Sequence, residues 1–186
     1  MCQLLWADLL PGDYNKDTAP RVGGRPVEVN VSIAVLSLEP EVSSKQAFLM
    51  DFFFQLHWYD YRLRAPPREK VTLGHQWRDK LWLPDMYFRN SIGGGLANML
   101  HPSVYFVITN GSRVYMASRF QMRFGCKMHF RKFPFDTQLC YINVTTLSQT
   151  VDIMRLSWDK FKFGSHVVLP EFELIDGAIG DHTPEP

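Results

Sequence analysis

Apolar and polar residues alternate along several stretches of this chain, a pattern typical of strands that bury one face. In residues 27–38 an apolar side chain occupies every second position from Val27 to Val35, with polar or small residues between them. Residues 113–126 alternate in the same way, with arginine at three positions on the polar face. We therefore predict two half-buried strands, the first ending at Glu39-Pro40-Glu41 because proline cannot donate to a strand ladder.

Further strands are predicted where apolar runs are separated by turn residues. Asn110-Gly111 is a strong signal for a two-residue hairpin, so residues 104–109 should pair with the strand that starts at residue 113. Residues 1–10 have helical spacing, and Gly93-Gly94-Gly95 indicates an irregular loop. Many short strands between turns favour an all-β protein with an antiparallel β-sandwich. The remaining predicted strands cover residues 47–63, 139–146, 153–158 and 172–175.

Composition places the chain among globular proteins and argues against some partners. Its 186 residues are enough for one domain with a sizeable core, and 46% of them are hydrophobic. The formal net charge is +1, from 20 basic and 19 acidic residues, which gives no electrostatic case for binding nucleic acid. No apolar run approaches about 18 residues, so no membrane-spanning segment is predicted.

The sequence carries none of the motifs that would indicate an enzyme or a resident cofactor. G-x-S-x-G, HExxH, P-loop and C-x-x-C patterns are all absent. The six histidines are scattered, and none has metal-ligand spacing to another. We predict no catalysis, no cofactor and no metal site, and we keep open a zinc or proton response through His57 or His166.

Two of the three cysteines bracket an unusually apolar loop, CKMHFRKFPFDTQLC, residues 126–140. A disulfide between Cys126 and Cys140 would stabilise the fold by about 3 kcal/mol, because it restricts the unfolded chain. Within the loop, Phe133-Pro134-Phe135 is a rigid apolar tip, which would normally be buried or contact a partner. This disulfide favours an extracellular setting, as do glycosylation sequons at Asn30, Asn110 and Asn143.

The spacing of this loop resembles the signature of the Cys-loop receptors, which are the pentameric ligand-gated ion channels. Residues Trp58–Leu63 resemble the family's W-x-D-x-R-L motif, and Leu81–Phe88 resemble its W-x-P-D-x-x-F motif. Within the family, the sequence is most similar to the anion-channel branch, which includes receptors for glycine, GABA, glutamate and histamine. It resembles an invertebrate-like orphan subunit of that branch. The loop signature is matched position by position by Cys126, Phe133, Pro134, Asp136 and Cys140.

The resemblance implies that residues 1–186 form the family's extracellular ligand-binding domain. The implied fold is an immunoglobulin-like antiparallel β-sandwich preceded by a short N-terminal helix. The chain is expected to stop before the last strand of that domain and before the family's four transmembrane helices. The implied function is agonist binding between subunits, coupled to the opening of a pore that conducts chloride.

Because agonist lies between neighbouring subunits in the family, the resemblance implies two separate sets of binding residues. Arg119 matches a basic position common in anion-selective members, and pairing with another residue would explain it equally well. One implied set is Tyr87, Thr146 and Leu147. The other is Phe53 and Gln55 on one strand and Ala117, Arg119 and Gln121 on another, and strand alternation places the members of each strand on one face.

Three departures from the family pattern bear on the agonist. Amino-acid-gated members typically carry an arginine where this chain has Gln55, and that arginine holds the ligand carboxylate as a bidentate fork. They often have Ser or Thr in place of Ala117. Leu147 stands where the family usually has an aromatic residue that attracts a cationic amine. These residues argue against ordinary amino-acid recognition and against a full aromatic cage, and they keep open an accessory subunit that binds no agonist itself.

The resemblance also gives the apolar loop a role in coupling. Phe133, Pro134, Phe135 and Asp136 would press on the channel's own membrane domain, with Glu39 and Glu41 beside them. The other implied partners are a small-molecule agonist and further subunits in a homo- or hetero-pentamer. The implied location is the extracellular side of a cell membrane, such as a postsynaptic one. A secreted soluble binding protein of the same fold is the alternative from another class.

Overall fold

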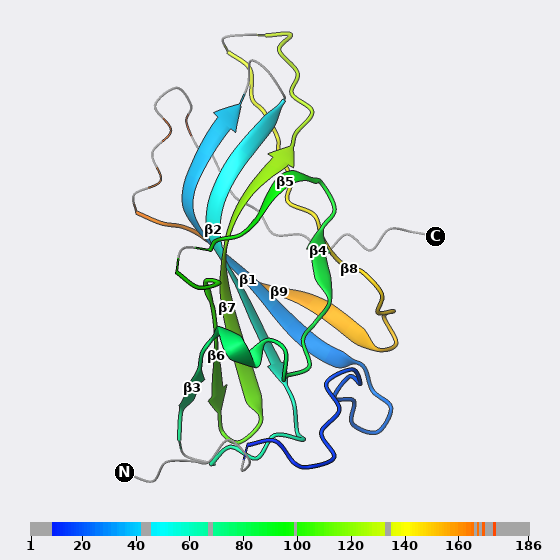
Figure 1. Ribbon diagram of the computed structural model, residues 1–186. Coiled ribbons are helices and arrows are strands. Elements are labelled where there is room, and N and C mark those ends of the chain that lie inside the picture. The colour runs from blue at the N-terminus through cyan, green and yellow to red at the C-terminus, as the bar shows by residue number, and fades with distance from the viewer. Residues whose placement is uncertain are drawn as a thin grey trace.

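The computed structural model of the protein describes residues 9–41, 46–66, 69–98, 100–132, 135–165, 167, 169 and 173. Within this part the chain consists mainly of strands and their connections (Figure 1). The long strands are β1 (Val27–Glu41), β2 (Ala47–Tyr59), β7 (Arg113–Gly125) and β9 (Met154–Phe163). The shorter elements are β3 (Val71–Leu73), the 3-10 helix η2 (His75–Trp77), β4 (Met86–Phe88), β5 (Ser91–Leu96), β6 (Val104–Thr109) and β8 (Val144–Thr146).

Seven of these strands form one twisted sheet in the order β3-β6-β7-β2-β1-β9, with β5 paired to the part of β7 that β6 leaves free. Strands β4 and β8 form a separate two-stranded sheet, which lies beside the large one in Figure 1. The prediction of an all-β sandwich is confirmed. One strand pair departs from the predicted antiparallel arrangement, because β1 and β9 run parallel.

Aromatic side chains fill the space between the two sheets. The ring of Phe88 on β4 lies 5.5 Å from that of Phe52 and 5.2 Å from that of Phe54, both on β2. It also lies 5.7 Å from Phe120 and 5.5 Å from Phe124, both on β7. All four of these contacts are edge-to-face, an arrangement that stabilises aromatic pairs beyond their burial alone. Phe88 thereby anchors the small sheet to the large one.

Two of the predicted strands, 27–38 and 47–63, end at other residues than expected. Strand β1 continues through Pro40 to Glu41, because beyond Val35 it has no β9 neighbour and an edge position tolerates proline. Strand β2 ends at Tyr59 instead of residue 63, because the chain turns at Asp60, whose backbone oxygen accepts a hydrogen bond from the Leu63 amide.

The predicted strand at residues 139–146 is present only as β8, Val144–Thr146. The residues before it are held by contacts outside any ladder. Cys140 is joined to Cys126, and the Asn143 backbone pairs with the Arg89 amide and the Asn90 side chain. The predicted N-terminal helix over residues 1–10 lies almost entirely outside the described residues. So does the predicted strand 172–175, of which only Glu173 is described, and not as a strand.

The glycine run at residues 93–95 is part of strand β5, so the predicted irregular loop is wrong. Gly94 has a φ of +105°, and a Cβ on it would lie 2.2 Å from the backbone oxygen of Gln121. Only glycine permits this close approach of β5 to β7. The predicted hairpin is confirmed: Asn110 and Gly111 have φ values of 51° and 80°, as a type I′ turn requires, and β6 pairs with β7.

Candidate functional site

The outer face of the large sheet brings together the implied binding residues of β2 and β7. In the β2–β7 register, Phe53 lies opposite Arg119, and Gln55 lies opposite Ala117. Gln121 lies opposite Asp51. Residues directly opposite in an antiparallel pair share a face, so these side chains lie on one face of the sheet, where Ala117 is buried. This face points away from the aromatic core, because the alternate residues Phe52 and Phe54 are buried.

Arg119 is engaged by a carboxylate of its own chain. Its Nε and Nη2 donate to the two oxygens of Asp51, at 2.9 and 2.5 Å. This bidentate hydrogen bonding raises the pKa of Arg119 above its ordinary value. A guanidinium held on this edge by Asp51 is not free to form the same fork with a ligand carboxylate.

A cluster of rings that the sequence did not predict adjoins this surface. The His57 ring lies 4.7 Å from that of Tyr115, which in turn lies 6.0 Å from that of Tyr105. Burial and the hydrogen-bonded hydroxyl of Tyr105 raise the pKa of Tyr115. Strand alternation could have indicated the cluster, because His57 follows Phe53 and Gln55 on the same face of β2. The surface beside Gln55 therefore carries aromatic rings at one end and the paired charges of Arg119 and Asp51 at the other.

His57 is predicted to make folding sensitive to acid. Burial, followed by the charge of Arg113, lowers the pKa of His57. Its Nδ1 is buried without a hydrogen-bond partner among the described residues. Since the unfolded chain takes up this proton near pH 6.5 and the folded chain resists it, stability should fall as pH drops below about 6.5. Urea unfolding at neutral and mildly acidic pH should show that the free energy of unfolding of His57→Gln falls less with decreasing pH than that of the natural chain.

The matched control for this prediction is His129→Gln, which removes one histidine from an exposed position. The prediction concerns the slope against pH and not the absolute stability, because the substitution at His57 also changes packing against Tyr115. A slope in His57→Gln that equals that of the natural chain would show that His57 contributes nothing to it.

The other implied set of binding residues lies on the small sheet and the segment after it. In the register of β4 and β8, Tyr87 lies opposite Thr145, and Met86 lies opposite Thr146. Tyr87 is 41% exposed and Leu147 is 74% exposed. The Thr146 hydroxyl donates to the backbone oxygen of Gln149 at 2.7 Å. An exposed tyrosine and leucine thus flank a threonine whose hydroxyl is engaged internally.

Asp85 ties together the segments that carry these residues. Its Oδ2 accepts hydrogen bonds from the Ser148 amide, at 2.8 Å, and from the Ser148 hydroxyl. Its backbone oxygen accepts from the Leu147 amide at 2.9 Å. Two acceptor oxygens here, Asp85 Oδ1 and Gln149 Oε1, are buried without a hydrogen-bond partner among the described residues. Sequence reasoning named the motif that contains Asp85 and did not name this role.

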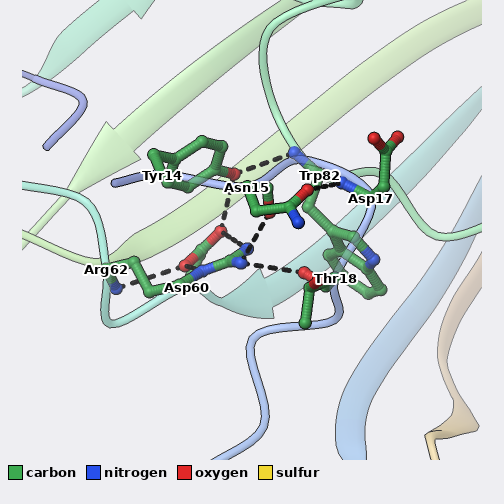
Figure 2. A network of polar contacts seen from close by, with 7 residues as sticks. All are labelled: Tyr14, Asn15, Asp17, Thr18, Asp60, Arg62 and Trp82. Atoms are coloured by element: carbon green, nitrogen blue, oxygen red, sulfur yellow. Dashed lines mark hydrogen bonds and ion pairs between the residues drawn. The ribbon is translucent and has the colours of Figure 1, made fainter. Parts of the chain in front are cut away.

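Figure 2 shows a polar network around the buried Asp60 that holds the backbone at Trp82, just before Asp85. Arg62 donates to both oxygens of Asp60 at 2.8 Å, and the Tyr14 hydroxyl donates to Asp60 Oδ2 at 2.9 Å. The Trp82 amide donates to the same hydroxyl at 2.8 Å. Burial is the main reason that the pKa of Tyr14 is raised. The network thus joins the N-terminal segment and the end of β2 to the backbone three residues before Asp85.

The two implied sets of binding residues are not brought together within one chain. Phe53 and Gln55 lie on the face of the large sheet that points away from the small sheet. Tyr87 alternates with Phe88, whose side chain packs between the sheets, so Tyr87 points outward on the other side. A site that used both sets would need a second subunit.

The predicted disulfide between Cys126 and Cys140 is present. Along the loop that it closes, Phe135 is 90% exposed, while Phe133 and Pro134 lie outside the described residues. Asp136 hydrogen-bonds with the Gln138 side-chain amide. Close to the loop, Glu41 accepts two hydrogen bonds from Arg123 at 2.8 Å, and Glu39 is exposed.

The sequon asparagines are all exposed. Asn30 lies on β1, Asn110 lies in the turn between β6 and β7, and Asn143 precedes β8. Glycan attachment at these positions stays a prediction.

Metal ligands do not gather in the part of the chain that the structure describes: no group of three or more His, Cys, Asp or Glu side chains could hold a metal ion there. The fold does bring two sequence-distant histidines together, since the rings of His75 and His101 stack at 4.8 Å. His166, the other histidine considered for zinc or proton sensing, lies outside the described residues. Among those residues, no helix is long and apolar enough to cross a membrane.

The sequence matches a known family and several of its members. The model of the family described as "Neurotransmitter-gated ion-channel ligand binding domain" matches residues 3–178. The Drosophila melanogaster "Gamma-aminobutyric acid receptor alpha-like" protein is 28% identical over 181 residues, which cover 95% of this chain and 26% of that protein. The human gamma-aminobutyric acid receptor subunit epsilon is 29% identical over 151 residues, covering 81% of this chain and 30% of that subunit.

A third relative is the human gamma-aminobutyric acid receptor subunit rho-1, which is 26% identical over 166 residues, covering 86% of this chain and 35% of that subunit. The chain therefore spans only about a quarter to a third of the length of these relatives. The strands, the disulfide loop and the family match define a ligand-binding domain of the Cys-loop type. The chain belongs to the neurotransmitter-gated ion-channel ligand-binding domain family.

Proposed function

We propose that this chain is the agonist-binding region of a subunit in a pentameric ligand-gated ion channel. Agonist binds between two subunits, one contributing Tyr87 and Leu147 and its neighbour contributing Phe53 and Gln55. The observation that carries this proposal is the split geometry: the two sets of residues face opposite sides of the sandwich and can meet only across two chains. We further propose that the subunit lies at a cell surface, with the pore in a membrane domain that adjoins the Cys126–Cys140 loop.

The chemistry of the β2–β7 face supports an agonist that is not held by a carboxylate–guanidinium fork. Gln55 can donate and accept hydrogen bonds but carries no charge. Arg119 is already paired with Asp51 in bidentate fashion. The neighbouring rings of His57 and Tyr115 add aromatic surface. An agonist with amide, hydroxyl or aromatic groups fits this face better than glycine, glutamate or GABA.

Binding is coupled to the pore through the Cys126–Cys140 loop. A change in the packing of two subunits would shift the large sheet, whose strand β7 leads directly into Cys126. The exposed Phe135 and the neighbouring Asp136 would carry that shift to the membrane domain. Agonist can bias opening only by the difference between its affinities for the open and closed arrangements.

The experiment is to express the complete subunit that contains this chain and to record currents. Amines, amino acids, protons and zinc are applied in turn. We expect weak or absent responses to GABA and glycine from the natural chain. Restoring a guanidinium in Gln55→Arg should increase the apparent affinity for GABA by about tenfold or more, because a charge-assisted hydrogen bond is gained.

Gln55→Met is the matched control, because it keeps the side-chain length without adding charge. Strong currents with glycine or glutamate that survive Gln55→Ala would contradict the argument from the missing arginine. A current evoked by protons alone and abolished in His57→Gln would instead favour the proton-responsive alternative. Absence of any current, together with secretion of the natural product, would favour the soluble binding protein.

A further inference from the structure

A hollow lies between the loop that precedes β1 and the end of β2, and the proposed function does not use it. Its volume is about 780 Å³, which is in the range of sites that hold small organic molecules. We call it the β1–β2 hollow, and its lining includes Arg25, Glu28, Tyr59 and Tyr61. Figure 1 shows the two segments together at the bottom of the molecule, at the opposite end of the large sheet from the Cys126–Cys140 loop.

Two stacked tyrosine rings line the β1–β2 hollow. The ring centroids of Tyr59 and Tyr61 are 5.7 Å apart, and their planes differ by 11°. The two residues are nevertheless 47% and 62% exposed, so stacking on each other does not cover them. Pro20 and Val27, which are buried, add apolar surface to the same hollow. A ligand ring placed here would gain both apolar burial and the additional stability of an aromatic pair.

The hollow also contains one positive and one negative side chain. Arg25 and Glu28 both line it, and both are exposed. In the parallel register of β1 and β9, Glu28 lies opposite Arg155. None of these three side chains takes part in an ion pair within the described part of the chain. The guanidinium of Arg25 and the carboxylate of Glu28 are therefore both available to a ligand.

The loop side of the hollow is held in shape by its own hydrogen bonds. The Arg25 amide donates to the Val22 oxygen at 3.1 Å, and the Arg21 guanidinium donates to the Gly24 oxygen. Gly23 and Gly24 have φ values of 59° and 75°, which glycine adopts without strain. A Cβ on Gly23 would meet no atom within 4 Å, so the space beside this backbone is open. A loop that is already formed loses less conformational entropy when a ligand binds.

We propose that the β1–β2 hollow binds a small zwitterion that carries an aromatic ring, such as an aromatic amino acid. The ring stacks on the pair of Tyr59 and Tyr61, while the carboxylate pairs with Arg25 and the ammonium group pairs with Glu28. Charge complementarity selects this class of ligand. An aromatic anion would meet the like charge of Glu28, an aromatic cation would meet that of Arg25, and an uncharged compound would leave both charges unpaired.

This site is separate from the proposed agonist face. Tyr59 lies four residues beyond Gln55 on β2, which places their Cα atoms roughly 13 Å apart. The residues that line the hollow all belong to one chain, so binding there requires no neighbouring subunit. The two proposals can therefore fail independently.

The test is titration of the full chain with L-phenylalanine, followed by NMR signals of the ligand. We expect a Kd of about a millimolar, as for a small ligand in an open site. L-Alanine, which lacks the ring, should bind about tenfold more weakly. Two further probes each lack one charge: 3-phenylpropionate has no ammonium group, and 2-phenylethylamine has no carboxylate. Each should bind about fivefold more weakly than L-phenylalanine, because one exposed ion pair is lost.

Three substitutions assign the groups of the ligand to residues of the hollow. Arg25→Gln should weaken binding of L-phenylalanine about fivefold and should not weaken that of 2-phenylethylamine. Glu28→Gln should weaken binding of L-phenylalanine about fivefold and should not weaken that of 3-phenylpropionate. Tyr61→Ala should weaken binding of all three compounds about fivefold, because it removes part of the stack.

Matched variants separate these effects from general changes in charge or packing. Tyr61→Phe keeps the ring and should bind L-phenylalanine as the natural chain does. Arg89→Gln and Glu69→Gln make the same changes in charge at exposed positions outside the hollow, and they should also bind as the natural chain does. Circular dichroism checks that each variant is folded.

Three outcomes would overturn the proposal. The first is a natural chain that shows no binding of L-phenylalanine at ten times the expected Kd. The second is L-alanine binding as tightly as L-phenylalanine, which would show that the tyrosine rings take no part. The third is binding that Gln55→Ala abolishes and Arg25→Gln retains in full, which would place the ligand on the proposed agonist face instead of the hollow.

Discussion

Asp60→Ala should destabilise the fold by about 3 kcal/mol, because it removes a buried carboxylate that accepts hydrogen bonds from a guanidinium and from the Tyr14 hydroxyl. Asp60 is 1% exposed, and its two oxygens accept from Arg62 and from the Tyr14 hydroxyl. Arg62 also donates to the backbone oxygens of Asn15 and Thr18, so the substitution disturbs the N-terminal segment too. Few positions in the described chain combine so complete a burial with so many polar contacts.

The measurement is urea unfolding of Asp60→Ala beside two controls. Asp60→Asn keeps the shape of the side chain and one acceptor oxygen, so its free energy of unfolding should fall less than that of Asp60→Ala. Asp51→Ala breaks an ion pair with similar geometry in which Arg119 is 40% exposed. Such exposed pairs contribute roughly 0–1 kcal/mol. Equal losses in Asp60→Ala and Asp51→Ala would show that burial does not distinguish the two pairs.

The same substitution bears on the candidate site. Tyr14 places its hydroxyl between Asp60 and the amide of Trp82, as Figure 2 shows. Trp82 precedes Asp85, whose side chain fixes Ser148. A loosened network would therefore displace the segment that carries Tyr87. The W-x-D-x-R-L motif is thus linked through Tyr14 and Trp82 to the segment that carries Tyr87.

The sequence predicted those parts of the fold that depend on local pattern. Alternation placed β1 and β7, and Asn110-Gly111 located the hairpin, because both signals reside in neighbouring residues. Strand β9 was predicted only to residue 158 and extends to Phe163. Prediction failed where a distant backbone decides the structure. Gly94 is a strand residue because it pairs with β7, and it must be glycine because β7 lies too close for any Cβ. Residues 139–143 stay irregular because Cys140 and Asn143 are held by partners far away in sequence.

The candidate site shows the same division. The resemblance placed Phe53, Gln55 and Ala117, and the β2–β7 register puts them on one surface. Nothing in the sequence singled out Asp51 as the partner of Arg119, or Gln138 as the partner of the His129 backbone across the loop. Both depend on pairing across segments, which a one-residue shift in register would have changed. The sequence therefore indicated which residues belong to the candidate site, but it did not indicate which side chains they pair with.

Phe88→Ala should destabilise the protein by about 3–5 kcal/mol, through lost burial and the cavity that remains. Phe88 is 8% exposed and contacts four phenylalanine rings of β2 and β7 at 5.2 to 5.7 Å. Because the small sheet contains only β4 and β8, three residue pairs long, its packing on the large sheet depends strongly on this one ring. The loss should therefore be concentrated in the small sheet, before the large sheet unfolds.

Two measurements separate local from global loss. Urea unfolding gives the total, and hydrogen exchange of the β8 amides reports the opening of the small sheet. Tyr87→Ala is the matched control: it truncates the adjacent aromatic residue on the same strand, but that side chain is 41% exposed and should cost about 0.5 kcal/mol or less. If Phe88→Ala speeds exchange on β8 and also weakens agonist binding, while Tyr87→Ala affects binding alone, then the aromatic core positions the site. Equal destabilisation by the two substitutions would instead show that the small sheet is not anchored through Phe88.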